Sequence, residues 1–573
     1  MNRNIEPILI SKNFTIRDTM QTITGAALKG CPTGIALVTG EDNKLLGVVT
    51  DGDIRRALIK DVDIDTPIKK IMITDPITVP RGLSEAEMLE LVTQKVKASG
   101  RIRDVKVNQV IVVDKHGRVD DVIDFFELWR ASDLKNKSVC VVALGFVGLT
   151  LSVILADIGF SVVGYDINEG VVRDINRGQP PFHEKGLSSL LKYHVNKGNL
   201  RGVAALEDGI SDIYILSVGT PLGNDHKPNM EYIIKSGRGI GRILKRRDIV
   251  ILRSTVPVGT TRNILLPILE KESALKGGED FYLSYAPERT IEGKALEELR
   301  SLPQVIGGYN KRSLDAAANF FSNLNHTIVS VSSLEAAEMV KLVNNSFRDI
   351  SFAFANELTM VCDLWGLDAV NVIKAANEGY PRNSIPVPSP GVGGICLKKD
   401  PYLYMHSAQD VGFQSDLPRV ARKINEYMPT FVFNKIESFI KTHKKKEPIK
   451  VFLIGFAFKG EPETSDIRDS TTIDLAKLIR NNTKRNLFGY DPVVNKEKIE
   501  KLGITGCSLR EGFKDADCVL IMNNHHSYMD MDILGLVELM NTPALLFDGW
   551  HIFPREEIER VDGIVYGSLS DEH

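Results

Sequence analysis

One cysteine lies in a glycine-rich, lysine-flanked loop phrase, GGICLKKD, in the second half of the 573-residue sequence. Gly393 and Gly394 come just before Cys396 and permit a close approach of the backbone to a partner. Lys398 and Lys399 follow it, and their positive charge favours the thiolate form of the side chain. Because a thiolate attacks carbonyl carbon, the pattern predicts that Cys396 is a nucleophile that forms a covalent intermediate.

A lysine and an asparagine stand four residues apart in the phrase AEMVKLVNN. Lys341 and Asn345 therefore share one face of a helix if this segment is helical. A lysine cation and an amide donor side by side would stabilise an alkoxide or the oxyanion of a tetrahedral intermediate. A lone pair of this spacing is usually part of a solvent-exposed helix face, so the spacing by itself leaves its role open.

The stretch CVVALGFVGLTL has the form of a dinucleotide-binding turn, with Ala143-x-Gly145-x-x-Gly148 in place of three glycines. An apolar strand precedes it, a helical pattern follows, and Asp166 ends the next strand, as this motif requires. Gly145 would admit the pyrophosphate, Gly148 would let helix and strand pack closely, and Asp166 would hold the ribose and repel a 2′-phosphate. The turn therefore predicts NAD rather than NADP. We expect Ala143 to be tolerated, because alanine is costly only where φ must be positive.

These residues need a framework, and the chain alternates apolar strands with helical patterns in two regions. Residues 137–325 contain the strand phrases SVCVVALG, SVVGYDI, DIYILSVGT, DIVILRSTV and FYLSYAPE. A second such region begins at residue 448, and residues 333–430 between the two are nearly all helical around a Gly/Pro-rich loop. This order predicts an α/β fold with two Rossmann-like parallel-sheet domains joined by a helical spine.

The N-terminal part of the chain consists of two similar halves, closed by LLGVVTDGDIRRAL and HGRVDDVIDFFELW. Each phrase reads as a hairpin followed by a helix, and together they resemble a tandem pair of CBS domains. The resemblance implies an adenine nucleotide bound by Thr50 and Asp53. The second half has Asp124 and Glu127 instead, whose carboxylates would repel phosphate, so we expect at most one nucleotide site. A purely structural pair that mediates self-association is the equally weighted alternative.

Composition excludes several classes of protein. The net charge is −3 with 43% hydrophobic and 25% charged residues, so nothing indicates nucleic acid as a partner. The sequence has no run of ~18 apolar residues and no signal-peptide core, so we expect a cytoplasmic protein without a membrane partner. The six cysteines are scattered, which argues against disulfides and zinc. His525 and His526 should point apart and have no acidic partner at ligand spacing, so no metal is expected.

Residues 137–560 resemble the UDP-glucose/GDP-mannose dehydrogenases, a family of nucleotide-sugar dehydrogenases. The resemblance rests on motifs in family order: LGFVGL, SVGTPL, STVPVGTT, APERTIEGKA, EMVKLVNN, GVGGICLKKDP and GFAFKGEPETSDIRDS. It implies an NAD-dependent oxidoreductase that converts the C6 alcohol of a nucleotide-sugar to a carboxylate. Two NAD molecules each take one hydride, and Cys396 carries a thiohemiacetal and then a thioester. The CBS pair is an addition to the usual family architecture.

The resemblance also implies a role for each matching residue. Asp400 and Thr220 would hold a water, Asp400 would take protons, and Glu288 would assist proton transfer and thioester hydrolysis. The implied catalytic residues are Cys396, Lys341, Asn345, Asp400, Glu288 and Thr220. The implied cofactor contacts are Gly145, Phe146, Val147, Gly148, Asp166, Thr220 and Thr255. The implied substrate contacts are Arg289, Lys341, Asn345, Arg422, Lys459 and Arg468.

The phrase APERT stands where UDP-glucose and GDP-mannose enzymes usually carry an NPEFL-like phrase, so the chain resembles the UDP-N-acetylhexosamine branch. Arg289 and Thr290 in place of Phe and Leu would make the pocket more polar, as an acetamido group requires. We expect UDP-N-acetylglucosamine or UDP-N-acetylmannosamine as substrate. UDP-glucose is the alternative, because Lys399 departs from the apolar residue of several acetamido-sugar members. A non-catalytic nucleotide-sensing regulator is an alternative of another class.

Four domains are expected in this chain. They are a tandem CBS module (1–133), an NAD-binding domain (134–328), a central helical and dimerisation domain with the cysteine loop (329–430), and a UDP-binding domain (431–573). The helical spine further predicts a homodimer or a larger homo-oligomer.

Overall fold

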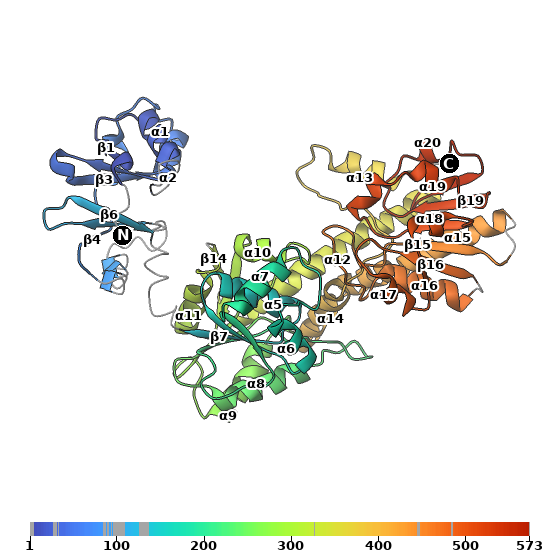
Figure 1. Ribbon diagram of the computed structural model, residues 1–573, viewed down its shortest axis with the longest axis horizontal. Helices are drawn as coiled ribbons and strands as arrows, with labels where there is room; N and C mark the ends of the chain where they lie inside the picture. Colours follow the sequence, from blue (N-terminus) through green and yellow to red (C-terminus); the bar gives the residue numbers. More distant parts are fainter. Residues whose placement is uncertain are drawn as a thin grey trace. The chain divides into compact units, whose positions relative to one another are not determined.

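The computed structural model describes residues 5–26, 31, 34–83, 87–88, 91–92, 94–95, 109–124, 137–325, 327–443, 447–482 and 485–571, without the side chains of Asp124 and Asn482. Glu127, on which the expectation of a single nucleotide site partly depends, lies outside the described residues. The chain forms two compact units, Met1–Lys137 and Ser138–His573 (Figure 1). In the part of the chain that is described, no helix has both the length and the apolar character needed to cross a membrane.

The N-terminal unit contains two three-stranded sheets of the same topology. Its strands are β1 (Leu9–Ser11), β2 (Ile35–Thr39), β3 (Leu45–Thr50), β4 (Thr78–Pro80), β5 (Gln109–Val113) and β6 (Val119–Asp124). In each sheet the first two strands are parallel, the last two are antiparallel, and the register shifts at the end of the middle strand. Ile111 and Val122 of the second half share a core with Ile35 and Leu37 of the first. The two predicted halves are thus repeats of one motif.

Eight strands form the first sheet of the second unit, in the order β14-β13-β12-β11-β10-β7-β8-β9. Their bounds are β7 (Ser138–Val142), β8 (Ser161–Tyr165), β9 (Leu200–Val203), β10 (Ile213–Leu216), β11 (Ile249–Leu252), β12 (Tyr282–Tyr285), β13 (Gln304–Gly308) and β14 (Ile328–Ser330). Only β12 and β13 pair antiparallel. The central strands β10 and β11 are buried along their whole length, which explains why their phrases are continuously apolar rather than alternating.

Four helices form the spine that follows this sheet. They are α12 (Leu334–Trp365), α13 (Ala369–Asn377), α14 (Ile395–Asp410) and α15 (Leu417–Thr442). The long helix α12 packs against both α14 and α15 (Figure 1). α15 continues through the predicted domain boundary at residue 430, because Val432, Ile436 and Phe439 keep the helical spacing and pack into the core of the following domain.

The last domain has a six-stranded, fully parallel sheet in the order β17-β16-β15-β18-β19-β20. The strands are β15 (Lys450–Ile454), β16 (Asn486–Tyr490), β17 (Thr505–Gly506), β18 (Cys518–Ile521), β19 (Ala544–Asp548) and β20 (Ile564–Gly567). Two α/β domains on either side of a helical spine are the architecture that the sequence predicts, so that prediction is confirmed.

Candidate active site

Cys396 is the second residue of α14, not a loop residue as its glycine-rich surroundings predicted. Gly394 precedes the helix with φ +85°, and a Cβ at this position would lie 2.7 Å from the ring of Phe458. Only glycine meets both conditions, so the turn packs tightly against the last domain. The thiol is thereby placed at a helix N-terminus, where backbone N–H groups favour negative charge.

The environment of the Cys396 thiol nevertheless favours its neutral form. The side chain is reachable by solvent, yet the protein around it removes much of its hydration. This desolvation and the charge of Asp400 raise the pKa of the thiol, and Lys341 and Lys399 offset them only in part. Lys398 pairs instead with Asp474, at 2.8 Å. The prediction that the two flanking lysines produce a thiolate is therefore corrected for the free protein.

Four predicted residues are connected by three hydrogen bonds and one ion pair. Asn345 Nδ2 donates to Asp400 Oδ2 at 2.5 Å and joins α12 to α14. Lys399 Nζ lies 3.1 Å from Asp400 Oδ1 and donates to the hydroxyl of Thr220 at 2.9 Å. The Thr220 hydroxyl donates in turn to the carbonyl of Thr255 at 2.6 Å. Two spine helices and the loops after β10 and β11 thus converge beside Cys396.

Lys341 lies one turn before Asn345 on α12 and is 8% exposed. The described residues offer its ammonium no hydrogen-bond or ion-pair partner, although its charge acts on Glu288 and on Cys396. A buried, unpaired cation is unfavourable. Lys341 is therefore well suited to bind a negatively charged oxygen of a ligand.

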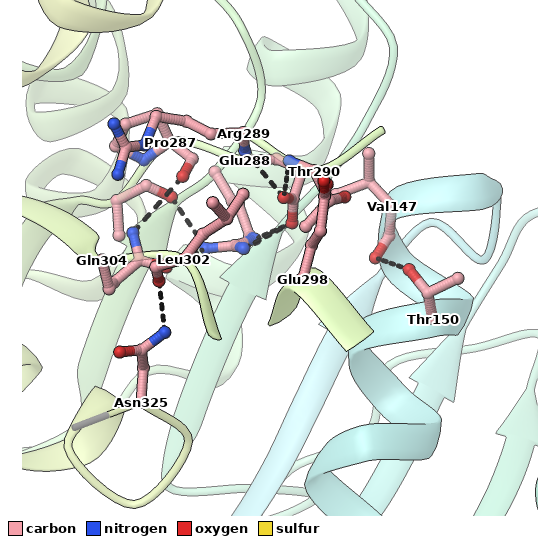
Figure 2. A network of polar contacts seen from close by, with 12 residues as sticks. Val147, Thr150, Pro287, Glu288, Arg289, Thr290, Glu298, Leu302, Gln304 and Asn325 are labelled. Carbon is pink, nitrogen blue, oxygen red and sulfur yellow. Dashed lines mark hydrogen bonds and ion pairs between the residues drawn. The ribbon is translucent and has the colours of Figure 1, made fainter. Parts of the chain in front are cut away.

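Glu288 is buried shortly after β12, and both oxygens of its carboxylate accept hydrogen bonds (Figure 2). Oε1 accepts the backbone N–H groups of Arg289 and Thr290, each at 2.7 Å. Oε2 accepts Nε of Arg253 at 3.1 Å and also its Nη2. Burial favours the neutral acid, but the charge of Arg253, the donors and the charge of Lys341 outweigh it and lower the pKa of Glu288.

Arg253 is absent from the sequence-based prediction. It directly follows β11 and is 2% exposed. Besides Glu288, its guanidinium donates to the carbonyl of Ala286 at 3.2 Å and to Gln304 Oε1 at 3.1 Å. The sequence phrase DIVILRST could have indicated this residue, because it has an arginine at the end of an apolar strand. A charge in that position needs a buried partner.

Glu338 is a second residue that the prediction missed. Its Oε2 accepts the N–H of Gly259 at 2.6 Å, and its Oε1 accepts the N–H and the hydroxyl of Thr261 at 2.8 and 2.5 Å. Burial raises the pKa of Glu338 to about 7 in spite of these donors. Ser407 Oγ accepts the N–H of Val258 at 2.9 Å. The loop after β11 is thus tied to both α12 and α14.

Two arginines predicted to contact substrate donate to the protein itself. Arg289 donates to the carbonyl of Pro303. Arg422 is 1% exposed and donates Nη1 to Asp349 at 2.6 Å and to the carbonyl of Leu397 at 3.3 Å. Arg422 therefore supports the first turn of α14, next to the nucleophile, and its guanidinium is already bound.

Lys459 and Arg468 lie on the last domain and face the first. Lys459 Nζ donates to the carbonyl of Glu292 at 2.5 Å, and burial lowers its pKa to about 8. Arg468 makes a two-pronged pair with Asp466 that raises its pKa, and its charge acts on Cys396. Lys459 therefore contacts the segment APERTIEGKA, and Arg468 acts on both this segment and the thiol.

The dinucleotide turn contains a strained residue. Ala143 has φ +73°, so the condition under which alanine carries a backbone cost is met at this position. A Cβ at Gly148 would lie 1.9 Å from the carbonyl oxygen of Ala143, which explains the third glycine. Around Gly145 no atom would lie within 4 Å of such a Cβ, so space remains for a ligand.

The same turn fits NAD. Asp166 Oδ2 accepts the N–H of Leu144 at 2.8 Å, which holds its carboxylate beside the turn with lone pairs left for a ribose. Phe146 and Val147 begin α5 (Phe146–Asp157), whose N-terminus has no side-chain cap and no acidic residue in its first turn. Its N–H groups are therefore available to a pyrophosphate.

Thr50 and Asp53 form a capping box at the start of α2 (Asp51–Ile59). The Thr50 hydroxyl donates to Asp53 Oδ2 at 2.7 Å, and Arg56 pairs with Asp53 Oδ1 at 2.6 Å. The spacing that predicted a nucleotide site is thus also the spacing that caps this helix.

His525 and His526 stack with ring centroids 4.4 Å apart, and Glu463 Oε2 lies 3.4 Å from His525 Nε2. The prediction that the rings point apart without an acidic partner is therefore wrong. The backbone N–H of Ser527 donates to His525 Nδ1 at 3.2 Å, so a neutral His525 carries its proton on Nε2, which then cannot ligate a metal. Glu463 Oε1 lies 3.1 Å from Nε2 of His183, so Glu463 connects the two α/β domains.

Comparisons with known proteins agree with this arrangement. The UDP-glucose/GDP-mannose dehydrogenase family matches in its NAD binding domain (residues 137–325), central domain (335–427) and UDP binding domain (452–555), and a CBS domain matches residues 1–60. UDP-N-acetyl-D-mannosamine dehydrogenase of Pyrococcus horikoshii is 34% identical over 72% of this chain and 95% of its own length. NDP-N-acetyl-D-galactosaminuronic acid dehydrogenase of Ralstonia solanacearum is 31% identical over 70% and 94%.

A solved structure extends the likeness to three dimensions. The UDP-D-ManNAc dehydrogenase of Pyrococcus horikoshii matches with a TM-score of 0.69 and 30% identity over 75% of this chain and 99% of that chain. The matched share is the size of the second unit, which holds all the residues around Cys396. The chain belongs to the UDP-glucose/GDP-mannose dehydrogenase family, and it is an NAD-dependent nucleotide-sugar dehydrogenase with a CBS domain at its N-terminus.

Proposed function

We propose that this chain oxidises the C6 alcohol of UDP-N-acetylmannosamine to the carboxylate, in two steps of two electrons each. The observation that carries the proposal is the convergence of Cys396, Asp400, Asn345 and the unpaired ammonium of Lys341 at one point of the spine. NAD, when bound at the turn after β7, takes up one hydride in each step.

The protein residues supply the remaining chemistry. In the first oxidation the C6 hydroxyl gives its proton to Asp400 through water, and Lys341 stabilises the negative charge on the C6 oxygen. Cys396 Sγ then bonds to the C6 carbon of the aldehyde while its proton passes to the C6 oxygen, giving a thiohemiacetal. The thiohemiacetal loses a hydride, and its hydroxyl proton passes to solvent, to leave a thioester. Asp400, aligned by Asn345, takes a proton from the water that attacks the thioester. The C–S bond then breaks, the thiol regains a proton, and the sugar leaves as a carboxylate.

The assignment of the sugar is supported by the relatives, whose names specify acetamido sugars of the manno and galacto series. The polar residues of the APERT phrase support it less directly, because Arg289 is bound to a carbonyl. An NADH-coupled screen of UDP-N-acetylmannosamine, UDP-N-acetylglucosamine, UDP-N-acetylgalactosamine and UDP-glucose tests it. Preference for UDP-N-acetylmannosamine with two NADH per sugar is expected, whereas preference for UDP-glucose would contradict it.

For the nucleotide part of the substrate, Lys459 and Arg468 are the proposed diphosphate ligands. The charges of both act on Glu292, and that of Arg468 also acts on Cys396. Since Lys459 donates to the carbonyl of Glu292 here, the substrate must take over that hydrogen bond. Lys459→Met should raise the KM for the UDP-sugar more than the KM for NAD. Equal changes in both constants would refute the role.

A homodimer through α12 is the proposed assembly. Large apolar side chains are exposed along this helix at intervals of four and seven residues, which is the spacing of one helix face. They are Val343, Phe347, Phe354, Val361 and Trp365. Light scattering should show a monomer for Phe347→Glu/Phe354→Glu and a dimer for the control Met529→Glu, an equally exposed site elsewhere. A dimer in both variants would exclude this interface.

An adenine nucleotide in the N-terminal unit is proposed on the CBS match and on Thr50 and Asp53. Calorimetric titration of the full chain with AMP, ADP and ATP tests it. Asp53→Ala should abolish binding, and the exposed neighbour Asp51→Ala should leave it intact. Binding that is unaltered in Asp53→Ala would refute the site. A reducing compartment, the cytoplasm, is proposed because Cys396 must remain a thiol for the covalent route.

A further inference from the structure

We infer that Arg253 is a positioning residue of the dehydrogenase site, which holds Glu288 as a fully hydrogen-bonded carboxylate so that its charge keeps the ammonium of Lys341 beside the reacting carbon. This inference rests on the proposed function and deepens it. It assigns Glu288 a fixed charge in the free protein, beside the proton-transfer role that the resemblance implied.

Glu288 has no acceptor site left for a substrate proton. A carboxylate offers four lone-pair directions, and four donors occupy them: two backbone N–H groups on Oε1, and two guanidinium N–H groups on Oε2 (Figure 2). In the free protein Glu288 is therefore a fixed, fully hydrogen-bonded charge.

Arg253 is itself fixed by three strand ends. It starts from the end of β11, bonds the carbonyl of Ala286 after β12, and bonds Gln304 at the start of β13. Gln304 Nε2 donates to the carbonyls of Pro287 and Val305 at 3.3 and 2.8 Å. Because these bonds leave the guanidinium little freedom, the carboxylate that it binds is fixed as well.

The negative charge of the Glu288 carboxylate acts on the ammonium of Lys341. Lys341 is buried, and the described residues give it no direct partner. Three charged groups face Glu288: Arg253 from the end of β11, Lys341 from α12, and Arg289, whose guanidinium bonds the carbonyl of Pro303. Loss of Arg253 would leave Glu288 buried with less positive charge around it, and it would protonate at a higher pH.

The test compares the pH dependence of kcat in the full-length protein, its Arg253→Gln variant and its Arg253→Lys variant. Arg253→Gln should lose roughly 100-fold at neutral pH, recover much of this loss at alkaline pH, and show an acid limb that the parent lacks. Arg253→Lys should show the same limb at lower pH, because lysine supplies the charge with fewer bonds. In Arg253→Gln/Glu288→Gln the limb should vanish. Arg242→Gln, which removes an exposed arginine–glutamate pair between two helices of the same domain, should keep the parent profile.

A loss of the same factor at every pH, or a limb that persists in the double variant, would overturn the inference. Difference infrared spectra against Glu288→Gln give a readout that needs no substrate. They should show an ionised Glu288 in the parent at mildly acidic pH and a protonated one in Arg253→Gln. If no UDP-sugar is oxidised but the spectra behave in this way, the proposed function fails and the role of Arg253 stands. If Arg253→Gln does not fold, Arg253→Lys decides both measurements.

Discussion

Asn345 Nδ2 donates to Asp400 Oδ2 at 2.5 Å, and this single hydrogen bond joins the helix that carries Lys341 to the helix that carries Cys396. Asp400 follows Cys396 by four residues, so both lie on one face of α14. The bond fixes one carboxylate oxygen, and Lys399 lies 3.1 Å from the other. Asp400 is therefore oriented by neighbours on two sides.

Asp400→Asn should remove the proton acceptor and keep the shape of the site. Hydrolysis of the thioester should slow by roughly 10²–10⁴-fold, since general-base catalysis contributes about that much. Rapid mixing should show a burst of NADH followed by a slow steady state, and mass spectrometry should find the sugar bound to the protein. Asp474→Asn, which changes the carboxylate that pairs with Lys398, is the control and should show no burst. Equal slowing of the burst and of the steady state would contradict this role.

Cys396→Ser should stop the reaction before the second oxidation. A serine hydroxyl forms a hemiacetal less readily than a thiol forms a thiohemiacetal, so the aldehyde should accumulate with one NADH per sugar. The measurement is the ratio of NADH to sugar consumed, with trapping of the aldehyde by hydroxylamine. The exposed thiol Cys396 should also account for most alkylation by iodoacetamide in the parent. Two NADH per sugar in Cys396→Ser would exclude the covalent route.

Ala143→Gly should stabilise the protein. A non-glycine residue at φ +73° costs the folded state about 1–2 kcal/mol, which the glycine variant avoids. Glycine also raises the entropy of the unfolded chain, and this cancels roughly 0.5–1 kcal/mol of the stabilisation. Denaturant unfolding should show a net increase of about 0.5–1 kcal/mol, with NAD affinity equal or higher by calorimetry. Ala156→Gly, in the regular part of α5, is the matched control and should lose about 1 kcal/mol. A loss in Ala143→Gly of the same size would refute the strain.

The sequence predicts those parts of the site that depend on local spacing. Lys341 and Asn345 share a helix face by their separation alone, and Gly148 follows from a motif whose turn is made by nearby residues. It does not predict Arg253 or Glu338, because their partners come from segments between 30 and 80 positions away, and only the packed sheet brings them together. The Cys396 thiol shows the same limit: neighbours in sequence suggested a low pKa, while burial and Asp400 determine it.

Glu338 should make stability depend on pH. Its pKa in the folded protein is raised to about 7 by burial, so the folded state holds this proton over a range in which the unfolded chain has lost it. The contribution is full below the ordinary glutamate pKa and is lost as the pH rises through 7. Between pH 4 and pH 8 the parent should lose up to about 3 kcal/mol relative to Glu338→Gln. Parallel stability curves for the two proteins would show that Glu338 is ionised throughout.

Arg422 should prove essential for the position of the nucleophile. Pro401 lies inside α14 and has no N–H, so the carbonyl of Leu397 lacks its helical partner and accepts Arg422 Nη1 instead. Arg422→Met breaks this bond and leaves Asp349 buried without its cation, which should cost about 3–5 kcal/mol of unfolding free energy. Adding Asp349→Leu should recover much of that stability, because no buried charge then remains unpaired. It should not recover kcat, since the carbonyl of Leu397, next to Cys396, still lacks a donor.

Arg419→Met, an exposed position on the same helix, is the control and should change the free energy of unfolding by less than about 0.5 kcal/mol. Recovery of both stability and kcat in the double variant would show that Arg422 serves only as the counterion of Asp349.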